Sequence, residues 1–149
     1  MSTVMPTKSP HDLDPAPEER VSQLENNAAP EATILLVEDD ASCLRALARN
    51  LRANGYTVLC ATNGSEALDI VHVQHVDVVV TDLLMPCMDG VDLLLNLKLD
   101  HANVPVLAIT GVRATNRLVR GARLYGARVL EKPFDGATLS RAVAGALGR

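Results

Sequence analysis

The segment Thr33-Ile34-Leu35-Leu36-Val37-Glu38-Asp39-Asp40 sets the interpretation of the whole chain. Four consecutive apolar residues, 34–37, indicate a strand that helices cover on both faces. Acidic residues follow at once, and further along the chain the apolar run Val78-Val79-Val80 leads in the same way into Asp82. Because the carboxyl ends of parallel strands share one edge of a sheet, where ligands bind, we expect these carboxylates to meet there.

The rest of the chain alternates between strand-like and helix-like patterns. The predicted strands are 33–37, 57–60, 77–81, 104–109 and 128–130. Apolar residues at helical spacing follow each of them. Five such pairs predict the α/β class, with a doubly wound five-stranded parallel sheet of the flavodoxin-like (βα)5 type.

Residues 1–30 have a different composition, with five of the eight prolines and few large apolar side chains. Such a segment buries too little apolar area to offset the entropy lost on ordering. The sequence therefore predicts a disordered N-terminal tail over 1–30 and a folded domain over 31–149.

Composition narrows the functions open to this domain. The chain is 48% hydrophobic, enough for a core, whereas only 2% of its residues are aromatic and its net charge is −4. Base stacking and polyanion binding are poorly supported, so we expect no direct binding of nucleic acid. No apolar run approaches the roughly 18 residues of a membrane span. Three cysteines without close spacing suggest neither a zinc framework nor disulfides, which indicates a cytoplasmic protein.

Two more polar residues fall at predicted strand ends, Thr110 and Lys132. Together with the three carboxylates they suit a divalent cation and a phosphoryl group. Mg²⁺ prefers oxygen ligands and would relieve the repulsion among the acidic groups. Asp82 could then attack phosphorus as a nucleophile, while Lys132 and Thr110 bind phosphoryl oxygens.

Several polar residues also have simpler explanations. Asp40 is typical of a helix N-cap. His72 and His75 are three residues apart, but without a third ligand nearby they are expected to be surface histidines rather than a metal site. A stripe of arginines is either a partner-binding face or a solvated helix face; its members are Arg117, Arg120 and Arg123.

These motifs resemble the receiver domain of two-component response regulators, over about Thr33 to Leu147. The resemblance rests on the acidic segment quoted above and on three others. They are Asp82-Leu83-Leu84-Met85-Pro86-Cys87-Met88-Asp89-Gly90, Thr110-Gly111 and Lys132-Pro133-Phe134. The Asp-x-x-Met-Pro-x-Met-Asp-Gly string is highly specific.

The resemblance implies a role for each matching acidic position. Asp82 would be the phosphoacceptor, taking its phosphoryl group from a sensor histidine kinase or a histidine phosphotransfer protein. Glu38 and Asp39 would bind Mg²⁺ together with Asp82, and the backbone carbonyl of Leu84 would complete the protein ligands.

The resemblance also implies roles for the other matching positions. Thr110 would be the switch hydroxyl, and Lys132 would contact the phosphoryl group, with a cis peptide bond before Pro133. In the family an aromatic switch residue lies three positions before the lysine. Val129 stands there in this chain, so coupling of the threonine to an aromatic rotamer cannot operate in the usual way.

The family contacts its downstream targets through the face that corresponds here to the helix 115–125, the strand 128–130 and the helix 137–147. A homodimer is compatible with the resemblance. The sequence ends at Arg149, shortly after the last predicted helix. We therefore expect a stand-alone receiver that accepts one phosphoryl group and switches protein contacts, rather than a turnover enzyme.

Three alternatives remain at this point. The chain could be a receiver fragment of a larger transcriptional regulator. It could be a Mg²⁺-dependent phosphohydrolase with an aspartate nucleophile. Such enzymes need a second aspartate two positions after the nucleophile, and this chain has Leu84 at that distance from Asp82 and Ala41 at that distance from Asp39. It could also be a degenerate receiver that is never phosphorylated, against which the intact acidic set argues.

Overall fold

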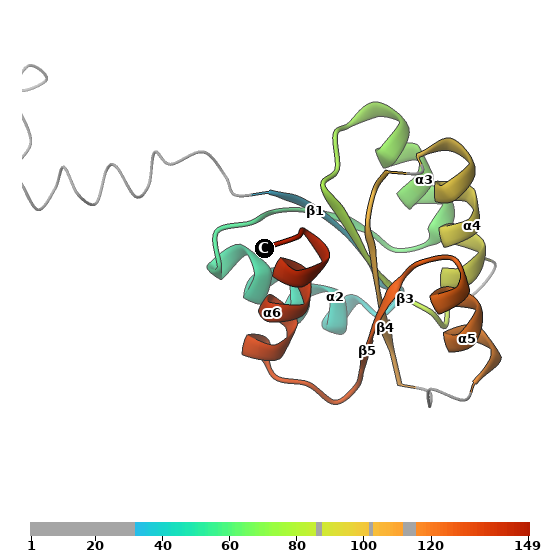
Figure 1. The fold of residues 1–149 in the computed structure, drawn as a ribbon. Helices are drawn as coiled ribbons and strands as arrows, with labels where there is room; N and C mark the ends of the chain where they lie inside the picture. Colours follow the sequence, from blue (N-terminus) through green and yellow to red (C-terminus); the bar gives the residue numbers. More distant parts are fainter. Residues whose placement is uncertain (1–31, 86–87, 102, 112–115) are drawn as a thin grey trace, which may run out of the picture.

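A computed structural model of the chain describes residues 32–85, 88–101, 103–111 and 116–149, so the predicted tail lies outside the described residues. Strands and helices alternate through this part (Figure 1). The strands are β1 (Thr33–Val37), β2 (Thr57–Ala61), β3 (Val78–Asp82), β4 (Val106–Thr110) and β5 (Arg128–Glu131). The helices are α2 (Ala41–Ala53), α3 (Gly64–Val73), α4 (Gly90–Asp100), α5 (Arg117–Leu124) and α6 (Gly136–Ala146).

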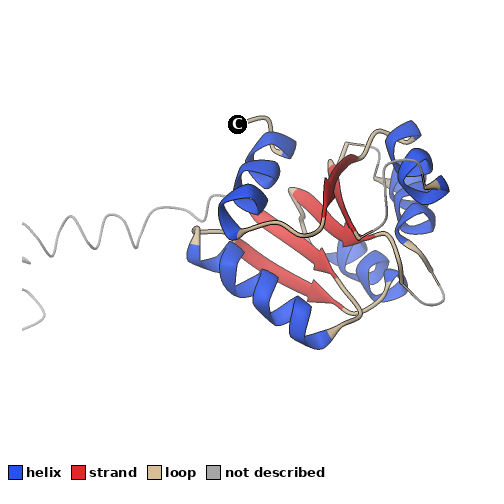
Figure 2. Cartoon of the chain, turned by 90° about the horizontal axis from the view of Figure 1, so that it is seen from below, coloured by secondary structure: helices blue, strands red, loops and turns tan. Residues whose placement is uncertain are grey.

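The five strands form one parallel sheet in the order β2-β1-β3-β4-β5. Helices α2 and α6 cover one face, and α3, α4 and α5 cover the other (Figure 2). The doubly wound, flavodoxin-like fold expected from the sequence is therefore confirmed. Strands β4 and β5 end at the lower edge in Figure 1, which is the edge that faces the viewer in Figure 2.

Alternate residues of the central strands supply two separate cores. Leu35 and Val37 of β1 pack with α3, α4 and α5, whereas Ile34 and Leu36 pack with α2 and α6. All four side chains are at most 1% exposed. Each buried Leu or Ile contributes about 1.5–3 kcal/mol relative to an exposed one, so β1 is well anchored before its acidic end.

Every described helix begins at an Asp or Asn N-cap whose side chain accepts a hydrogen bond from a backbone amide of the first turn. The caps are Asp40, Asn63, Asp89, Asn116 and Asp135. Each such cap typically stabilises its helix by about 1 kcal/mol. These caps fix where the helices begin beside the edge at which the strands end.

Several strand boundaries differ by one or two residues from the sequence-based expectation, and two of these differences have a clear cause. Asp82 is the last residue of β3 rather than the first of a loop, because it pairs with Ile109 of β4 in the parallel ladder. Strand β4 begins at Val106 rather than at Val104, whose amide donates to the carbonyl of His101 within a turn. The intervening Pro105 has no amide hydrogen to give to a ladder.

Candidate functional site

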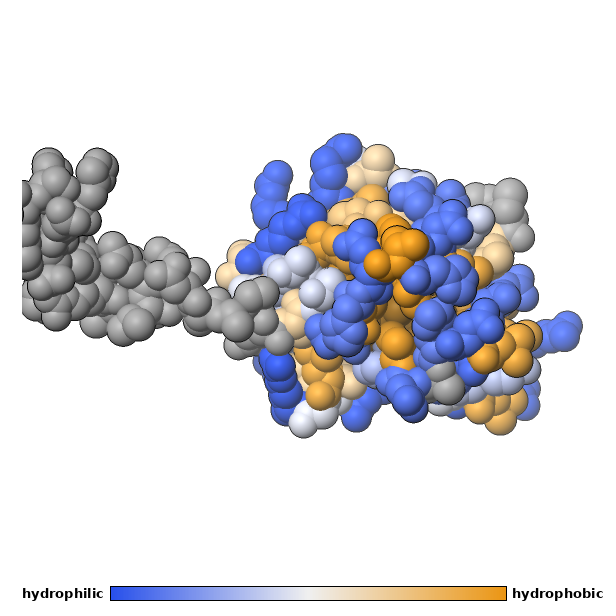
Figure 3. Space-filling view, turned by 90° about the horizontal axis from the view of Figure 1, so that it is seen from above, coloured by the Kyte–Doolittle hydropathy of each residue, from blue (hydrophilic) through white to orange (hydrophobic). Residues whose placement is uncertain are grey.

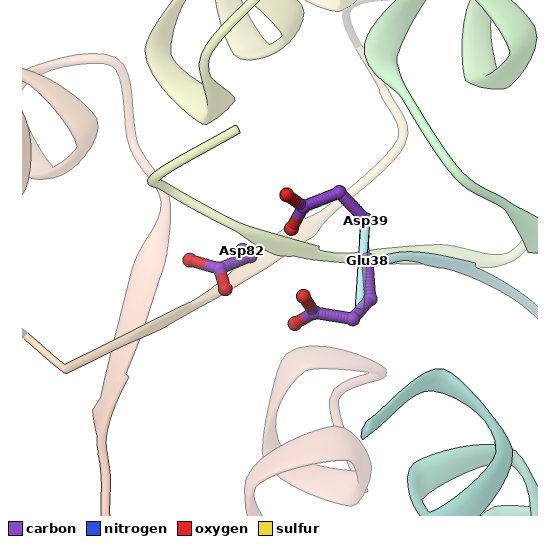
Figure 4. A group of neighbouring side chains, drawn as sticks. All are labelled: Glu38, Asp39 and Asp82. Carbon is purple, nitrogen blue, oxygen red and sulfur yellow. The ribbon is translucent and has the colours of Figure 1, made fainter. Parts of the chain in front are cut away.

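Three carboxyl groups converge where β1 and β3 end (Figure 4). Glu38 and Asp39 follow β1, and Asp82 closes the neighbouring β3. Each offers a carboxylate oxygen, and these oxygens lie within 4.8 Å of one another. Glu38 is only 3% exposed and Asp82 only 8%, whereas Asp39 is exposed. The group is thus half enclosed and open to solvent on the side of Asp39.

Backbone hydrogen bonds continue the ladder past the end of β1 and so fix the position of the first carboxylate. The amide of Glu38 donates to the carbonyl of Ala61 at the end of β2, at 3.1 Å. The Glu38 side chain in turn accepts the amide of Asp40 at 3.1 Å. Asp40 itself caps α2 by accepting the amide of Cys43, as its sequence context predicts. Within the acidic segment, Glu38 and Asp39 therefore belong to the site, whereas Asp40 caps α2.

Lys132 reaches the carboxylates from the end of β5. Its backbone amide donates to the carbonyl of Thr110 at 2.8 Å, which extends the β4–β5 pairing. Its Nζ lies 3.3 Å from Oδ2 of Asp82 and 3.8 Å from Oε2 of Glu38. The Lys132–Pro133 peptide bond is cis, as the resemblance implies. A cation and two of the acidic groups, distant in sequence, thus form one contact network.

Thr110 and Leu84 flank the central aspartate. Thr110 is the last residue of β4, fully buried, and follows Ile109, which pairs with Asp82 in the sheet. The amide of Leu84 donates to Oδ1 of Asp82 at 2.9 Å, while the Leu84 side chain is 49% exposed. Both oxygens of Asp82 therefore have donors, one from the backbone and one from Lys132.

Burial and neighbouring charges shift the pKa values of Glu38 and Lys132. Burial raises the pKa of Glu38 from its usual 4.5 to about 7; the hydrogen bond from the Asp40 amide opposes this, and the carboxyl groups of Asp82 and Asp39 add to it. Burial alone would lower the pKa of Lys132, but the charges of Asp82 and Glu38 raise it overall. Burial therefore favours the protonated form of Glu38, and the neighbouring carboxyl groups add to this effect.

This donor set fits a hard divalent cation. The available atoms are carboxylate oxygens, which Mg²⁺ prefers over nitrogen or sulfur, and the open side leaves room for retained waters. A cation would also favour the ionised form of Glu38, whose pKa is raised in its absence.

The remaining predicted residues have distinct surroundings. Val129 is half-buried on β5, where it pairs with Ala108 and packs on the side of α3, α4 and α5. The stripe of Arg117, Arg120 and Arg123 is exposed on α5. Cys87 and residues 112–115 lie outside the described part of the chain.

One neighbour of the site was not expected from the sequence. Cys43, in the first turn of α2, lies close enough to the network that the pKa of its thiol is raised, by burial and then by Glu38. Its position three residues after the Asp40 cap could have indicated this, since the first turn of α2 begins directly at the end of β1.

Known proteins are similar to this chain in both sequence and fold. The response regulator receiver domain family matches residues 34–144. The response regulator MprA of Mycolicibacterium vanbaalenii is 36% identical over 101 residues, which cover 68% of this chain and 44% of that protein. MprA of Mycobacterium bovis is 35% identical over the same length. This chain therefore spans less than half the length of these curated relatives.

Solved structures give the same result. The signal receiver domain of an HD domain-containing protein from Pseudomonas fluorescens has a TM-score of 0.73 and 29% identity, covering 78% of this chain and 94% of that one. The chemotaxis response regulator CheY4 of Vibrio cholerae has a TM-score of 0.72 and 27% identity, covering 77% and 98%. With a family match over 111 residues and a shared fold, the chain belongs to the response regulator receiver domain family of two-component systems.

Proposed function

We propose that Asp82 accepts a phosphoryl group from a sensor histidine kinase or a histidine phosphotransfer protein, in a reaction that needs Mg²⁺. The observation that carries this proposal is the contact of Lys132 with both Asp82 and Glu38 beside a third carboxylate. Family membership supports it, because the matched region includes every residue involved.

In the proposed reaction an oxygen of Asp82 attacks phosphorus as the bond from phosphorus to the donor's histidine nitrogen breaks. The nitrogen keeps the electron pair, and an aspartyl phosphate forms. Glu38, Asp39, Asp82 and the carbonyl of Leu84 would hold the Mg²⁺. The bound ion would neutralise charge on the transferred group.

Two side chains of the sheet edge would receive the phosphoryl oxygens. Lys132 already donates to Oδ2 of Asp82, so an oxygen bonded to the new phosphorus would lie within its reach. Thr110 ends the adjacent strand and would donate its hydroxyl to another oxygen. Both residues stand at the same edge of the sheet as Asp82, where the product would form.

The consequence of phosphorylation is a change in protein contacts rather than turnover of a substrate. We assign the output surface to α5, β5 and α6, the face that the family resemblance implies, where Val129 takes the place of the aromatic switch. This assignment holds for a stand-alone receiver and for one joined to an output domain, and it leaves homodimerisation open as a form of output. Cys43 and Cys60 are free thiols, which fits a cytoplasmic setting.

Incubation with acetyl phosphate and Mg²⁺, followed by intact-mass measurement, tests the proposal. We expect a gain of one phosphoryl group per chain, lost on adding EDTA and absent in Asp82→Asn. Asp89→Asn is a matched control, since asparagine can still cap α4 and the modification should persist. Labelling that survives in Asp82→Asn would refute the assignment, and continuous hydrolysis of a simple phosphate ester would favour a phosphohydrolase instead.

A further inference from the structure

Two histidines from neighbouring helices meet on the side of the molecule away from the carboxylates. His72 lies in the last turn of α3, and His101 is the C-cap of α4. Nδ1 of His72 is 3.1 Å from Nε2 of His101, and the ring centroids are 5.1 Å apart with a tilt of 50°. From the sequence His72 and His75 were expected to be surface histidines rather than a metal site, but the folded chain brings His72 beside His101, 29 positions away.

The position of the pair follows from the fold. In a parallel α/β sheet each helix runs back against the strands, so α3 and α4 end at the edge where the strands begin. Figure 3 views the molecule from this edge, where an apolar patch is bordered by hydrophilic residues. Asp82 lies at the opposite edge, at the end of β3. The pair is therefore separate from the proposed phosphoacceptor site.

The geometry of the two ring nitrogens suits a shared metal ion. Imidazole nitrogens bind zinc at about 2.0–2.1 Å. Two such bonds to nitrogens 3.1 Å apart enclose an angle of roughly 100° at the ion, between the octahedral and tetrahedral values. Without a metal, only one proton can occupy the space between two neutral rings. A cation can take the place of that proton and bind both rings through their lone pairs.

A hollow beside His101 leaves room for further ligands. It has a volume of about 310 Å³, and its lining includes His101, His75, Asp77 and Asn103. His75 contacts Asp77 at 2.8 Å. Within the described residues, Glu38, Asp39 and Asp82 are the one group of three acidic, histidine or cysteine residues whose ligand atoms all lie within 4.8 Å. Water would thus complete the coordination of an ion held by the two histidines.

We propose that His72 and His101 form a binding site for a divalent transition metal of the zinc class. The ligands come from two separate helices, so bound metal would connect the ends of α3 and α4. Since the two nitrogens are brought together only in the folded chain, metal would bind the folded state preferentially and stabilise it. Mg²⁺ would not substitute, because it favours oxygen ligands.

Zinc titration of the full chain by calorimetry, with excess Mg²⁺ to occupy the carboxylates, tests this site. We expect one zinc ion per chain and a rise in melting temperature on adding zinc chloride. His72→Ala and His101→Ala should each weaken binding by about tenfold or more, since even losing a supporting contact to a ligand costs about 10–100-fold. His72→Gln and His101→Gln, which keep a polar side chain, should do the same if either alanine variant unfolds.

Two further variants make the result specific. His11→Ala removes a histidine outside the described residues and should leave zinc binding unchanged. Asp82→Asn should also leave it unchanged, so failure of the phosphoacceptor proposal and failure of this one are distinguishable. The proposal is overturned if the wild-type chain binds no zinc at millimolar concentration, or if the His72 and His101 variants bind it as tightly as the wild type.

Discussion

Lys132 is the residue on which the charge balance of the site depends. It contacts Asp82 and Glu38 at 3.3 and 3.8 Å, yet the pKa of Glu38 still rises to about 7. One ammonium group therefore does not offset the burial of Glu38 and the proximity of two more carboxylates. A bound cation would favour the ionised form of Glu38, so we expect metal binding to change the charge of the site.

The shifted pKa of Glu38 predicts a pH dependence of stability in the absence of metal. Its folded-state pKa of about 7 exceeds its usual 4.5, so the folded chain retains a proton that the unfolded chain releases between these values. Stability from this group is present below pH 4.5 and is lost as the pH rises through 7, by up to about 3 kcal/mol.

Urea unfolding in EDTA at pH 5 and pH 8 measures this loss. The decrease between the two pH values should be smaller in Glu38→Gln, which does not titrate, and Mg²⁺ should reduce it in the wild type. An identical pH dependence in the wild type and in Glu38→Gln would contradict the shifted pKa.

Asp39 and Asp40 are adjacent but predicted to have separate roles. Asp40→Ala removes the cap of α2 and should lower the free energy of unfolding by about 1 kcal/mol, with little change in Mg²⁺ affinity. Asp39→Ala should weaken Mg²⁺ binding and leave the cap intact, because its carboxylate belongs to the acidic group. Unfolding in EDTA and calorimetric Mg²⁺ titration separate the two effects, and a shared pattern in both variants would refute this division.

At the level of elements, the site depends on how closely α4 begins against β3. Gly90, the first residue of α4, donates its amide to the carbonyl of Leu83 at 3.0 Å. A Cβ at this position would lie 2.5 Å from the carbonyl oxygen of Asp82 and 2.8 Å from Cα of Leu83. Glycine is required here for close approach of two backbones rather than for an unusual φ angle.

Gly90→Ala should therefore destabilise the fold by about 1–3 kcal/mol, as overpacking does, and lower the phosphorylation rate by displacing Asp82. Gly121→Ala in α5 is the matched control, since its Cβ would make an ordinary contact with Val91 at 3.5 Å. Alanine is the better helix former, so this variant should be neutral or more stable, by up to about 1 kcal/mol. Equal unfolding midpoints for the two variants would show that the close approach is unimportant.

At the level of the whole molecule, the described residues form one sheet with a core on each face. Both faces of β1, β3 and β4 are covered by helices of this region. The carboxylates lie at the edge where the strands end, and the histidine pair lies at the ends of α3 and α4, at the opposite edge. None of the helices in the described part of the chain has both the length and the hydrophobicity of a membrane-spanning segment.

We accordingly predict that residues 31–149 form the receiver domain without help from the N-terminal segment. Deleting residues 1–30 should change the free energy of unfolding by less than about 0.5 kcal/mol, as for changes away from packed regions, and should preserve phosphorylation by acetyl phosphate. Chemical unfolding of both proteins and intact-mass analysis give the comparison. A large loss of stability would mean that the segment packs on the domain.

The sequence by itself determined the fold class, the order of the elements and the set of candidate residues. Apolar runs such as 34–37 and 78–80 are periodic, local signals, and parallel strands bring their ends to one edge whatever the details. The helix cap at Asp40 was a local signal of the same kind, whereas the cap at Asp89 was found only in the structure.

Only the tertiary structure decided which groups are in contact and how these contacts shift their pKa values. Three features depend on side-chain packing between elements. They are the contact of Lys132 with both Asp82 and Glu38, the place of Cys43 beside these residues, and the pairing of His72 with His101. The pKa of Glu38 depends on its burial, which no single segment sets. The local sequence pattern determines at which end of a strand or helix a residue lies. The distances between side chains of different elements, and the burial that shifts their pKa values, are set only when all the elements pack together.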